Sequence, residues 1–310
     1  MTGRAPAQPT RAATVQARHG HRLIVADDDG ATFTATTRSR RSDLTVGDRV
    51  SIAILGADQA VIESAEPRRN LIRRSDAWRT KALAANVDQV AVVIAPSPPY
   101  SDELLSRLLI EATVQDVPVA VIANKRDLHD GDPGFARRLA LYRSLGHAVI
   151  PVSAIDAAEA QAALADALRD RTTLLAGQSG MGKSTLVNAL VPDAGLRTQA
   201  ISTALDAGRH TTTFTRMFEL AAPLSGRLVD SPGFQQFGLD HLSASQRLHA
   251  MPECRPLLGQ SRFNSCTHRD EPGCAIRAAA DEGTIDASRY TLLLRLHEES
   301  RLSDPASSRR

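Results

Sequence analysis

The chain has 310 residues, of which 42% are hydrophobic, and this length is sufficient for two or three domains with ordinary cores. No apolar run approaches the ~20 residues of a membrane-spanning helix, the first residues lack an apolar signal core, and the three cysteines, all within 254–274, do not suggest a disulfide framework. These features argue against a membrane protein and a disulfide-rich secreted domain. They favour a cytoplasmic protein, expected to be a monomer with no membrane partner.

The formal net charge of +2 is unevenly spread along the chain. Residues 1–81 hold 14 Lys and Arg against 9 Asp and Glu, residues 82–240 hold 13 against 17, and residues 241–310 hold 10 against 9. A basic N-terminal part beside an acidic central part favours a polyanionic partner such as nucleic acid. An arginine-rich surface exposed to solvent would give the same counts.

The N-terminal part predicts a small β-barrel. Residues 1–12 are polar and contain prolines, and we expect a tail without fixed structure there. Between 13 and 67, short strands separated by turns are expected at 21–26, 31–37, 49–55 and 59–65, without an intervening helix. An OB-fold, a five-stranded barrel used to bind nucleic acids, suits this pattern. An SH3-like barrel would have almost the same pattern.

The central part, 68–240, predicts an α/β domain. A linker begins at 66–70, and strands then alternate with helices. Strands are expected at 89–95, 118–123, 147–152, 172–176 and 226–229, and helices at 101–115, 134–145, 155–169 and 184–190. Such alternation is typical of a parallel sheet covered by helices. After Asp230 the alternation stops, and 241–310 is expected to be a small third domain with a helix at 287–302.

A complete phosphate-binding loop of the form GxxxxGK[ST] follows the strand at 172–176. Its residues are Gly177, Gln178, Ser179, Gly180, Met181, Gly182, Lys183 and Ser184, followed by Thr185. The glycines allow successive backbone N–H groups to point at a phosphate without interference from Cβ atoms. Lys183 is expected to contact the β- and γ-phosphate oxygens, and the Ser184 hydroxyl to bind Mg²⁺. The start of the following helix also favours an anion.

A guanine-reading loop of the form NKxD lies upstream, at Asn124-Lys125-Arg126-Asp127. The Asp127 carboxylate can accept hydrogen bonds from guanine N1–H and N2–H₂ together, whereas adenine offers no such donor pair. Asn124 is expected to tie the base to neighbouring loops, and Lys125 to lie along the purine face. Ser153-Ala154 follows the next strand, and the Ala154 N–H is expected to contact guanine O6.

Two switch segments follow the phosphate loop. Asp230-Ser231-Pro232-Gly233 has the form DxxG, in which Asp binds Mg²⁺ through water and the Gly amide senses the γ-phosphate. Between the phosphate loop and DxxG lies Gly208–Thr213, where Thr212, with Thr211 next, is the candidate for a second direct Mg²⁺ ligand. Phe234 stands where many GTPases place a water-orienting Gln, so slow intrinsic hydrolysis is expected. Gln235 and Gln236 are adjacent to it.

The guanine loop precedes the phosphate loop, which is the reverse of the usual order and indicates a circularly permuted domain. The full motif set resembles the circularly permuted GTPases of the YjeQ/RsgA family. The segments 68–70, 84–89, 208–213 and 271–274 are also similar to that family, and the resemblance extends over about 13–300.

The resemblance implies a GTPase that hydrolyses GTP to GDP and phosphate, is stimulated by the small ribosomal subunit, and acts late in the maturation of that subunit. It further implies an OB-fold that contacts ribosomal RNA, and makes His210 a candidate to position water; a structural role for His210 is the alternative. A nucleotide-gated RNA-binding assembly factor with incidental hydrolysis, or a permuted GTPase serving another RNA, are the competing interpretations. Because DxxG leads directly into the third domain, we expect nucleotide to control the angle between domains.

The family also has a zinc site with the pattern C-x4-C-x-H-x5-C. Cys266, His268 and Cys274 match its last three ligands, whereas Ser261 stands at the first. Serine is a poor zinc ligand. Cys254 is a candidate to take the place of the first cysteine, but it lies farther upstream than the pattern requires. Three ligands with a water could hold Zn²⁺ more weakly, and a metal-free domain held by packing is the alternative.

Overall fold

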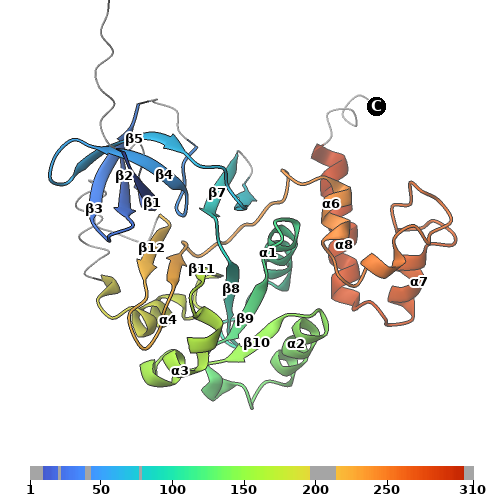
Figure 1. Cartoon of the computed structure of the whole chain (residues 1–310). Coiled ribbons are helices and arrows are strands. Elements are labelled where there is room, and N and C mark those ends of the chain that lie inside the picture. Colours follow the sequence, from blue (N-terminus) through green and yellow to red (C-terminus); the bar gives the residue numbers. More distant parts are fainter. Residues whose placement is uncertain (1–9, 20–21, 39–42, 77–78, 196–213, 304–310) are drawn as a thin grey trace, which may run out of the picture.

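A computed structural model describes residues 10–19, 22–38, 43–76, 79–195 and 214–303 (Figure 1). In chain order these residues form a β-barrel, a sheet covered by helices, and a group of C-terminal helices. Figure 1 shows the barrel at the upper left, the sheet below it, and the C-terminal helices on the right, beside α1 (Asp102–Val114). Within these ranges, no helix is both long and apolar enough to cross a membrane.

The N-terminal barrel is the expected OB-fold. Its strands are β1 (Thr10–His19), β2 (Arg22–Asp27), β3 (Thr32–Thr37), β4 (Arg49–Ile54) and β5 (Gln59–Ala65). They pair in the order β1-β2-β3-β5-β4, β1 closes the barrel on β4, and β3 and β5 run parallel. This topology separates the OB-fold from the SH3-like alternative. Alternate side chains such as Val15, Val25 and Ile52 are buried inside.

The first barrel strand starts earlier than expected. It begins at Thr10, within the segment 1–12 that was expected to form a tail. Thr10 pairs with Ala53 on β4, and the pairing continues to Thr14. Partnership with β4 therefore orders residues whose own composition predicts no structure.

The central sheet has the order β10-β9-β8-β11-β13-β12. Its strands are β8 (Gln89–Ile94), β9 (Val119–Ala123), β10 (Ala148–Pro151), β11 (Thr172–Gly177), β12 (Arg216–Glu219) and β13 (Arg227–Asp230). All neighbours are parallel except β12, which is antiparallel to β13. Every residue of β8 and β9 is buried, as in parallel sheets with helices on both faces. The phosphate-loop strand β11 lies centrally, with the guanine-loop strands on one side of it.

The helices of this domain follow the predicted spans closely. They are α1, η1 (Arg126–Leu128), α2 (Pro133–Ser144), α3 (Ala157–Leu168) and α4 (Lys183–Leu190). The N-caps are Ser101, Asp132 and Asp156, whose side chains accept backbone N–H groups of the first turn. Leu105, Leu108 and Leu109 of α1 are buried against the sheet.

A hairpin of β6 (Leu71–Ser75) and β7 (Thr80–Ala85) occupies the region where only a linker was expected. The segments around it connect the barrel to the α/β domain. Arg68 Nε donates to Asp48 Oδ1 of the barrel at 2.7 Å, and Asn86 Nδ2 donates to Gly47 O at 2.9 Å. The segments 68–70 and 84–89, which carried part of the family resemblance, therefore hold the interdomain junction.

Strand β12 was also not predicted, and it pairs with β1 at Ala17 and Arg216.

The C-terminal helices pack on each other and on α1. They are α6 (Ala244–His249), η2 (Arg255–Leu257), α7 (Ala275–Asp281) and α8 (Ala287–Ser303). Leu292, Leu293 and Leu296 of α8 are buried, as the helical pattern predicted. Arg247 of α6 donates to Leu239 O at 2.7 Å and to Leu296 O at 3.1 Å, which fixes α8 to the chain entering this domain.

Candidate functional site

The phosphate loop connects β11 to α4 in a shape that requires glycine. Gly180 has φ +84° and Gly182 has φ +86°, a region that residues with a Cβ rarely adopt. A Cβ on Gly182 would lie 2.2 Å from Asn124 Nδ2, and one on Gly180 would lie 2.6 Å from Pro98 Cγ. The loop is thus packed tightly against the guanine loop and the end of β8. Ser184 and Thr185, in the first turn of α4, are exposed.

Asn124 ties three loops together. Its Nδ2 donates to Met181 O in the phosphate loop at 2.9 Å, and its Oδ1 accepts from the Ala154 N–H at 3.0 Å. Lys125 has a left-handed backbone, and its Nζ donates to Gly180 O at 3.1 Å and to Ser97 O at 2.6 Å. Asn124 therefore connects the guanine loop to the phosphate loop and to the loop at Ala154 without a bound nucleotide. Asp127 lies on η1 with an exposed side chain, accessible to a base.

The contact expected between the Ala154 N–H and guanine O6 has a competitor. That N–H already donates to Asn124 Oδ1. Ser153 and Ala154 are both buried, whereas the next residue, Ile155, is 82% exposed. Asn124 thus holds the Ala154 N–H inside the protein, and the loop meets solvent at Ile155.

The DxxG segment lies directly on the phosphate loop. Lys183 Nζ donates to Asp230 Oδ1 in a buried ion pair. A Cβ on Gly233 would be 3.6 Å from Gly177 O and from Ser179 N, and the Phe234 N–H donates to Gly177 O at 3.4 Å. A movement of Gly233 would therefore shift the phosphate loop, and a movement of the phosphate loop would shift Gly233.

Phe234, at the position after DxxG, is a core residue. It is 3% exposed and stacks edge-on with Phe237 at 5.3 Å between ring centroids. Gln235 and Gln236 are exposed and line a hollow that Glu103 and Arg107 of α1 also line. The expected switch segment, with His210, Thr211 and Thr212, lies outside the described residues.

Some residues that shape the site were missed by motif analysis. The Gln178 side chain was expected only as part of the phosphate loop, yet it accepts from the Ser101 N–H at 3.1 Å and donates to Ser101 O at 2.9 Å. Ser97 and Pro98, after β8, contact Lys125 and Gly180. The only sequence signal for this support was the position of the Ser-Pro-Pro run directly after a buried strand.

A second cluster lies in the C-terminal part of the chain. The ligand atoms of Cys266, His268 and Cys274 all lie within 4.8 Å of one another. His268 Nδ1 is 3.4 Å from Cys274 Sγ, close to the ~3.6 Å expected for a nitrogen and a sulfur on one tetrahedral zinc ion. Burial lowers the pKa of His268 and so favours its neutral, ligating form. These donors therefore fit zinc.

The loop carrying these donors is held in shape by the protein. Glu271 accepts from the Thr267 N–H at 2.7 Å and from the Thr267 hydroxyl at 2.6 Å. Tyr290 of α8 donates to His268 O at 2.6 Å. Cys254 is not part of the cluster. It is fully buried and lies outside the group of donors within 4.8 Å of one another, so it does not replace the missing first ligand.

A family model for the RsgA GTPase matches residues 65–240, more than half of the chain. The chain belongs to the RsgA GTPase family. The fold class and the family resemblance predicted from the sequence are thereby confirmed, including the circular permutation that places the NKxD strand before the phosphate loop.

Relatives and solved structures agree with this family. Proteins named small ribosomal subunit biogenesis GTPase RsgA from Paraburkholderia phytofirmans and Bordetella pertussis are 46% and 47% identical, over 97% and 93% of this chain and 99% and 96% of their own. The crystal structure of YjeQ from Thermotoga maritima has a TM-score of 0.71 at 26% identity, over 94% of this chain and 99% of that one. YloQ, a circularly permuted GTPase, shares the fold with a TM-score of 0.69 at 22% identity, over 98% and 99%.

Proposed function

We propose that this protein hydrolyses GTP to GDP and phosphate, is stimulated by the small ribosomal subunit, and acts late in the maturation of that subunit by binding its rRNA. The observation that carries the proposal is the convergence of the guanine loop, phosphate loop and DxxG through Asn124 and Lys183. The names of the relatives support the ribosomal role. We likewise propose that the protein acts in the cytoplasm and binds its RNA target as a monomer.

Guanine selection is assigned to the loop around Asp127. Its exposed carboxylate would accept from the N1–H and N2–H₂ groups of the base. Asn124 keeps the loop against Met181, and Lys125, already bridged to Gly180, would cover the purine face. Backbone N–H groups of the phosphate loop would surround the β-phosphate, with the start of α4 favouring its charge.

Magnesium would be held by hydroxyl and carboxylate oxygens, which are the donors this ion prefers. We assign Ser184 and Thr212 as direct ligands and Asp230 as a ligand through water. When bound, the ion would neutralise charge on the β- and γ-phosphates. Lys183 would then exchange Asp230 for phosphate oxygens, which frees the carboxylate for its new role. Lys183 is thus the main positive charge that the described protein offers to the phosphates.

Hydrolysis is expected to be slow without a partner. The core packing of Phe234 removes the position after DxxG from water orientation. We propose that His210 and Thr212 act in hydrolysis when the small ribosomal subunit is bound. Replacing His210 by Ala should then lower subunit-stimulated turnover, whereas unchanged turnover would exclude it from the mechanism.

The rRNA contact is proposed for the side of the barrel that meets the β6–β7 hairpin. A pocket of about 790 Å³ lies there, bordered by Pro232 of DxxG and by six basic residues. These are Arg18, Arg68, Arg73, Arg74, Arg79 and Lys81. Positive charge gathered in a hollow suits a phosphate backbone. The position of Pro232 would let RNA and nucleotide influence each other.

The test is GTP turnover titrated separately with purified small and large ribosomal subunits. Stimulation by the small subunit alone is expected. Equal turnover with and without small subunits, together with GTP-dependent RNA binding, would favour the alternative of a nucleotide-gated RNA-binding factor with incidental hydrolysis. Sequencing of co-purified RNA would identify a different RNA partner.

We also propose that Cys266, His268 and Cys274 hold one Zn²⁺, which metal analysis of purified protein would test.

A further inference from the structure

The Cys/His cluster has a fourth corner, and Ser261 occupies it. The Ser261 hydroxyl lies 3.9 Å from Cys274 Sγ and also accepts from the Ala275 N–H at 3.2 Å. A cysteine at this position would complete a closed tetrahedral site. A neutral serine hydroxyl is a much weaker donor, and its bond to Cβ is shorter than that of a thiol. Ser261 therefore lies at the corner without closing it.

No other described side chain replaces the missing thiolate. Cys254 is buried in the core and outside the group of close donors. His297 of α8 stacks edge-on to His268 at 6.1 Å between ring centroids, and it is not among the donors within 4.8 Å. Within the described ranges, the cluster thus offers three protein ligands, which is the number found in zinc sites that keep one position open.

A pocket of about 450 Å³ adjoins this corner. Three of the four corner residues line it: Ser261, Cys266 and His268. Leu248 and Phe263 contribute apolar wall, and its volume is in the range that holds small molecules. The side of the cluster where Ser261 lies therefore faces a pocket large enough for a small ligand.

We propose that the zinc site of this protein has an exchangeable fourth coordination position that opens into this pocket and accepts a small thiol. The incoming thiol releases its proton to solvent, and its thiolate takes the position otherwise accessible to water. Sulfur is the donor that this site lacks at Ser261, and zinc has a high affinity for thiolate. This inference rests on the proposed zinc site, and it makes that site responsive to low-molecular-weight thiols.

Cobalt-substituted full-length protein provides the test, with protein in excess over Co²⁺ under anaerobic conditions. Co²⁺ bound by two thiolates gives a thiolate-to-cobalt charge-transfer band. Adding 2-mercaptoethanol should raise its intensity by about half, as a third thiolate joins the two protein thiolates. Absence of any charge-transfer band would reject the zinc site itself. A band that 2-mercaptoethanol leaves unchanged would reject only the open position.

Two variants separate the remaining explanations. Ser261→Cys should start at the higher, three-thiolate intensity and show no response to 2-mercaptoethanol, because the fourth corner is closed. Ser261→Ala should bind Co²⁺ and respond like the unmodified protein. Loss of Co²⁺ binding in Ser261→Ala would mean that the serine is itself a ligand, which would overturn the proposal. Retained thiol response in Ser261→Cys would also overturn it, since the exchange would then occur elsewhere.

Discussion

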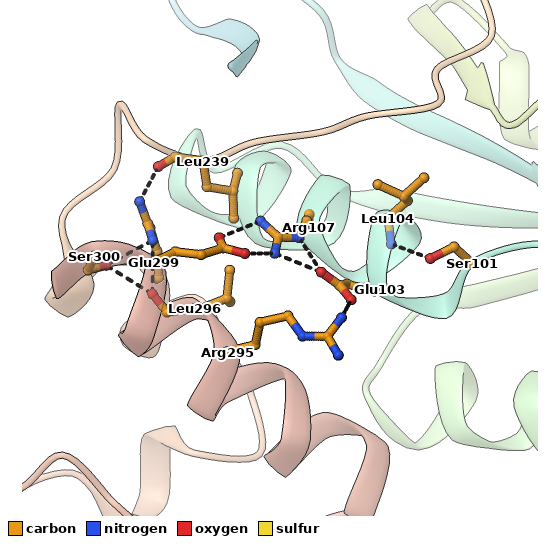
Figure 2. A network of polar contacts seen from close by, with 10 residues as sticks. Ser101, Glu103, Leu104, Arg107, Leu239, Arg295, Leu296, Glu299 and Ser300 are labelled. Carbon is orange, nitrogen blue, oxygen red and sulfur yellow. Dashed lines mark hydrogen bonds and ion pairs between the residues drawn. The ribbon is translucent and has the colours of Figure 1, made fainter. Parts of the chain in front are cut away.

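Arg107 of α1 and Glu299 of α8 form a two-pronged ion pair that joins the nucleotide domain to the C-terminal helices (Figure 2). The Arg107 side chain is 6% exposed, and its Nη1 donates to Glu299 Oε2 at 2.9 Å. The same guanidinium donates to Glu103 on its own helix, and Arg295 of α8 also reaches Glu103 (Figure 2). The network thus connects residues 192 positions apart in the chain.

Removing Arg107 should loosen this junction. Arg107→Met removes the guanidinium that binds both Glu299 and Glu103, while Arg295 still contacts Glu103. We expect the free energy of unfolding to fall by about 1–3 kcal/mol. This is less than the ~3–5 kcal/mol lost when a fully buried ion pair is broken, because Glu299 and Glu103 are 35% and 28% exposed. Urea unfolding measures this free energy, and hydrogen exchange of α8 shows whether the junction opens more often. The control is Arg169→Met, which removes a solvent-exposed pair with Asp166 and should lower the unfolding free energy much less. Equal losses in both variants would contradict the expectation.

Asn124→Ala should weaken guanine nucleotide binding. The substitution leaves the Met181 carbonyl and the Ala154 N–H without their partner, and each unpaired buried group costs about 1–3 kcal/mol. Because 1.4 kcal/mol corresponds to tenfold in affinity, GDP affinity should fall by about tenfold or more in calorimetry. Asn188→Ala, an exposed position on α4, is the matched control and should bind normally. Normal GDP binding by Asn124→Ala would show that the three loops hold together without it.

Asp127→Asn should change the preferred base. A carboxylate accepts from both guanine N1–H and N2–H₂, whereas an amide presents one acceptor and one donor. Xanthine has a carbonyl oxygen in place of the guanine amino group, which suits the amide donor. We therefore expect GTP affinity to fall by at least about tenfold while XTP affinity rises. Competition between the two nucleotides for both proteins measures this. Loss of GTP binding without a gain for XTP would indicate that Asp127 acts through the fold instead.

The meeting of the guanine loop, the phosphate loop and DxxG can be predicted from the sequence because each motif is a run of consecutive residues at a strand end. The residues of the phosphate loop and of NKxD each determine the conformation of their own loop, and the ends of neighbouring strands place the two loops side by side. By contrast, the β6–β7 hairpin was missed because Arg73 and Arg74 interrupt the apolar alternation, and its strands are stabilised by pairing and by Glu111 of α1. The inward turn of Ala154 depends on Asn124, 30 residues away, and no local pattern encodes it.

The pH dependence of the C-terminal domain should reveal Glu271. Hydrogen bonds from the Thr267 hydroxyl and from backbone N–H groups lower the pKa of Glu271 to about 2, from an ordinary 4.5. A lowered pKa in the folded state contributes stability that is present above about pH 4.5 and lost as the pH falls toward 2. The difference in unfolding free energy between the unmodified protein and Glu271→Gln should be constant above pH 5 and shrink below it. A difference that is flat from pH 6 to 3 would contradict this assignment.

The segment after DxxG is anchored at several points. Gly238 and Ser75 exchange backbone hydrogen bonds at 2.9 Å in both directions. His241 lies 2.8 Å from Glu111 Oε2 on α1 and 3.0 Å from Ser75 Oγ. Gly233 of DxxG packs against the phosphate loop. A nucleotide-dependent movement of Gly233 would therefore be transmitted to both the β6–β7 hairpin and the C-terminal helices. The sequence alone suggested only the second of these routes.

This arrangement predicts that nucleotide sets the affinity for the small ribosomal subunit. Protein loaded with a non-hydrolysable GTP analogue and protein loaded with GDP should differ in subunit affinity by about 5–150-fold, the usual range of coupling between sites. His241→Ala removes the contacts to Glu111 and Ser75 and should reduce that ratio, while His249→Ala, at an exposed position of α6, should preserve it. Sedimentation binding with purified subunits measures both ratios. Equal affinity of the two loaded forms of the unmodified protein would rule out the coupling, and an unchanged ratio in His241→Ala would remove this contact from its path.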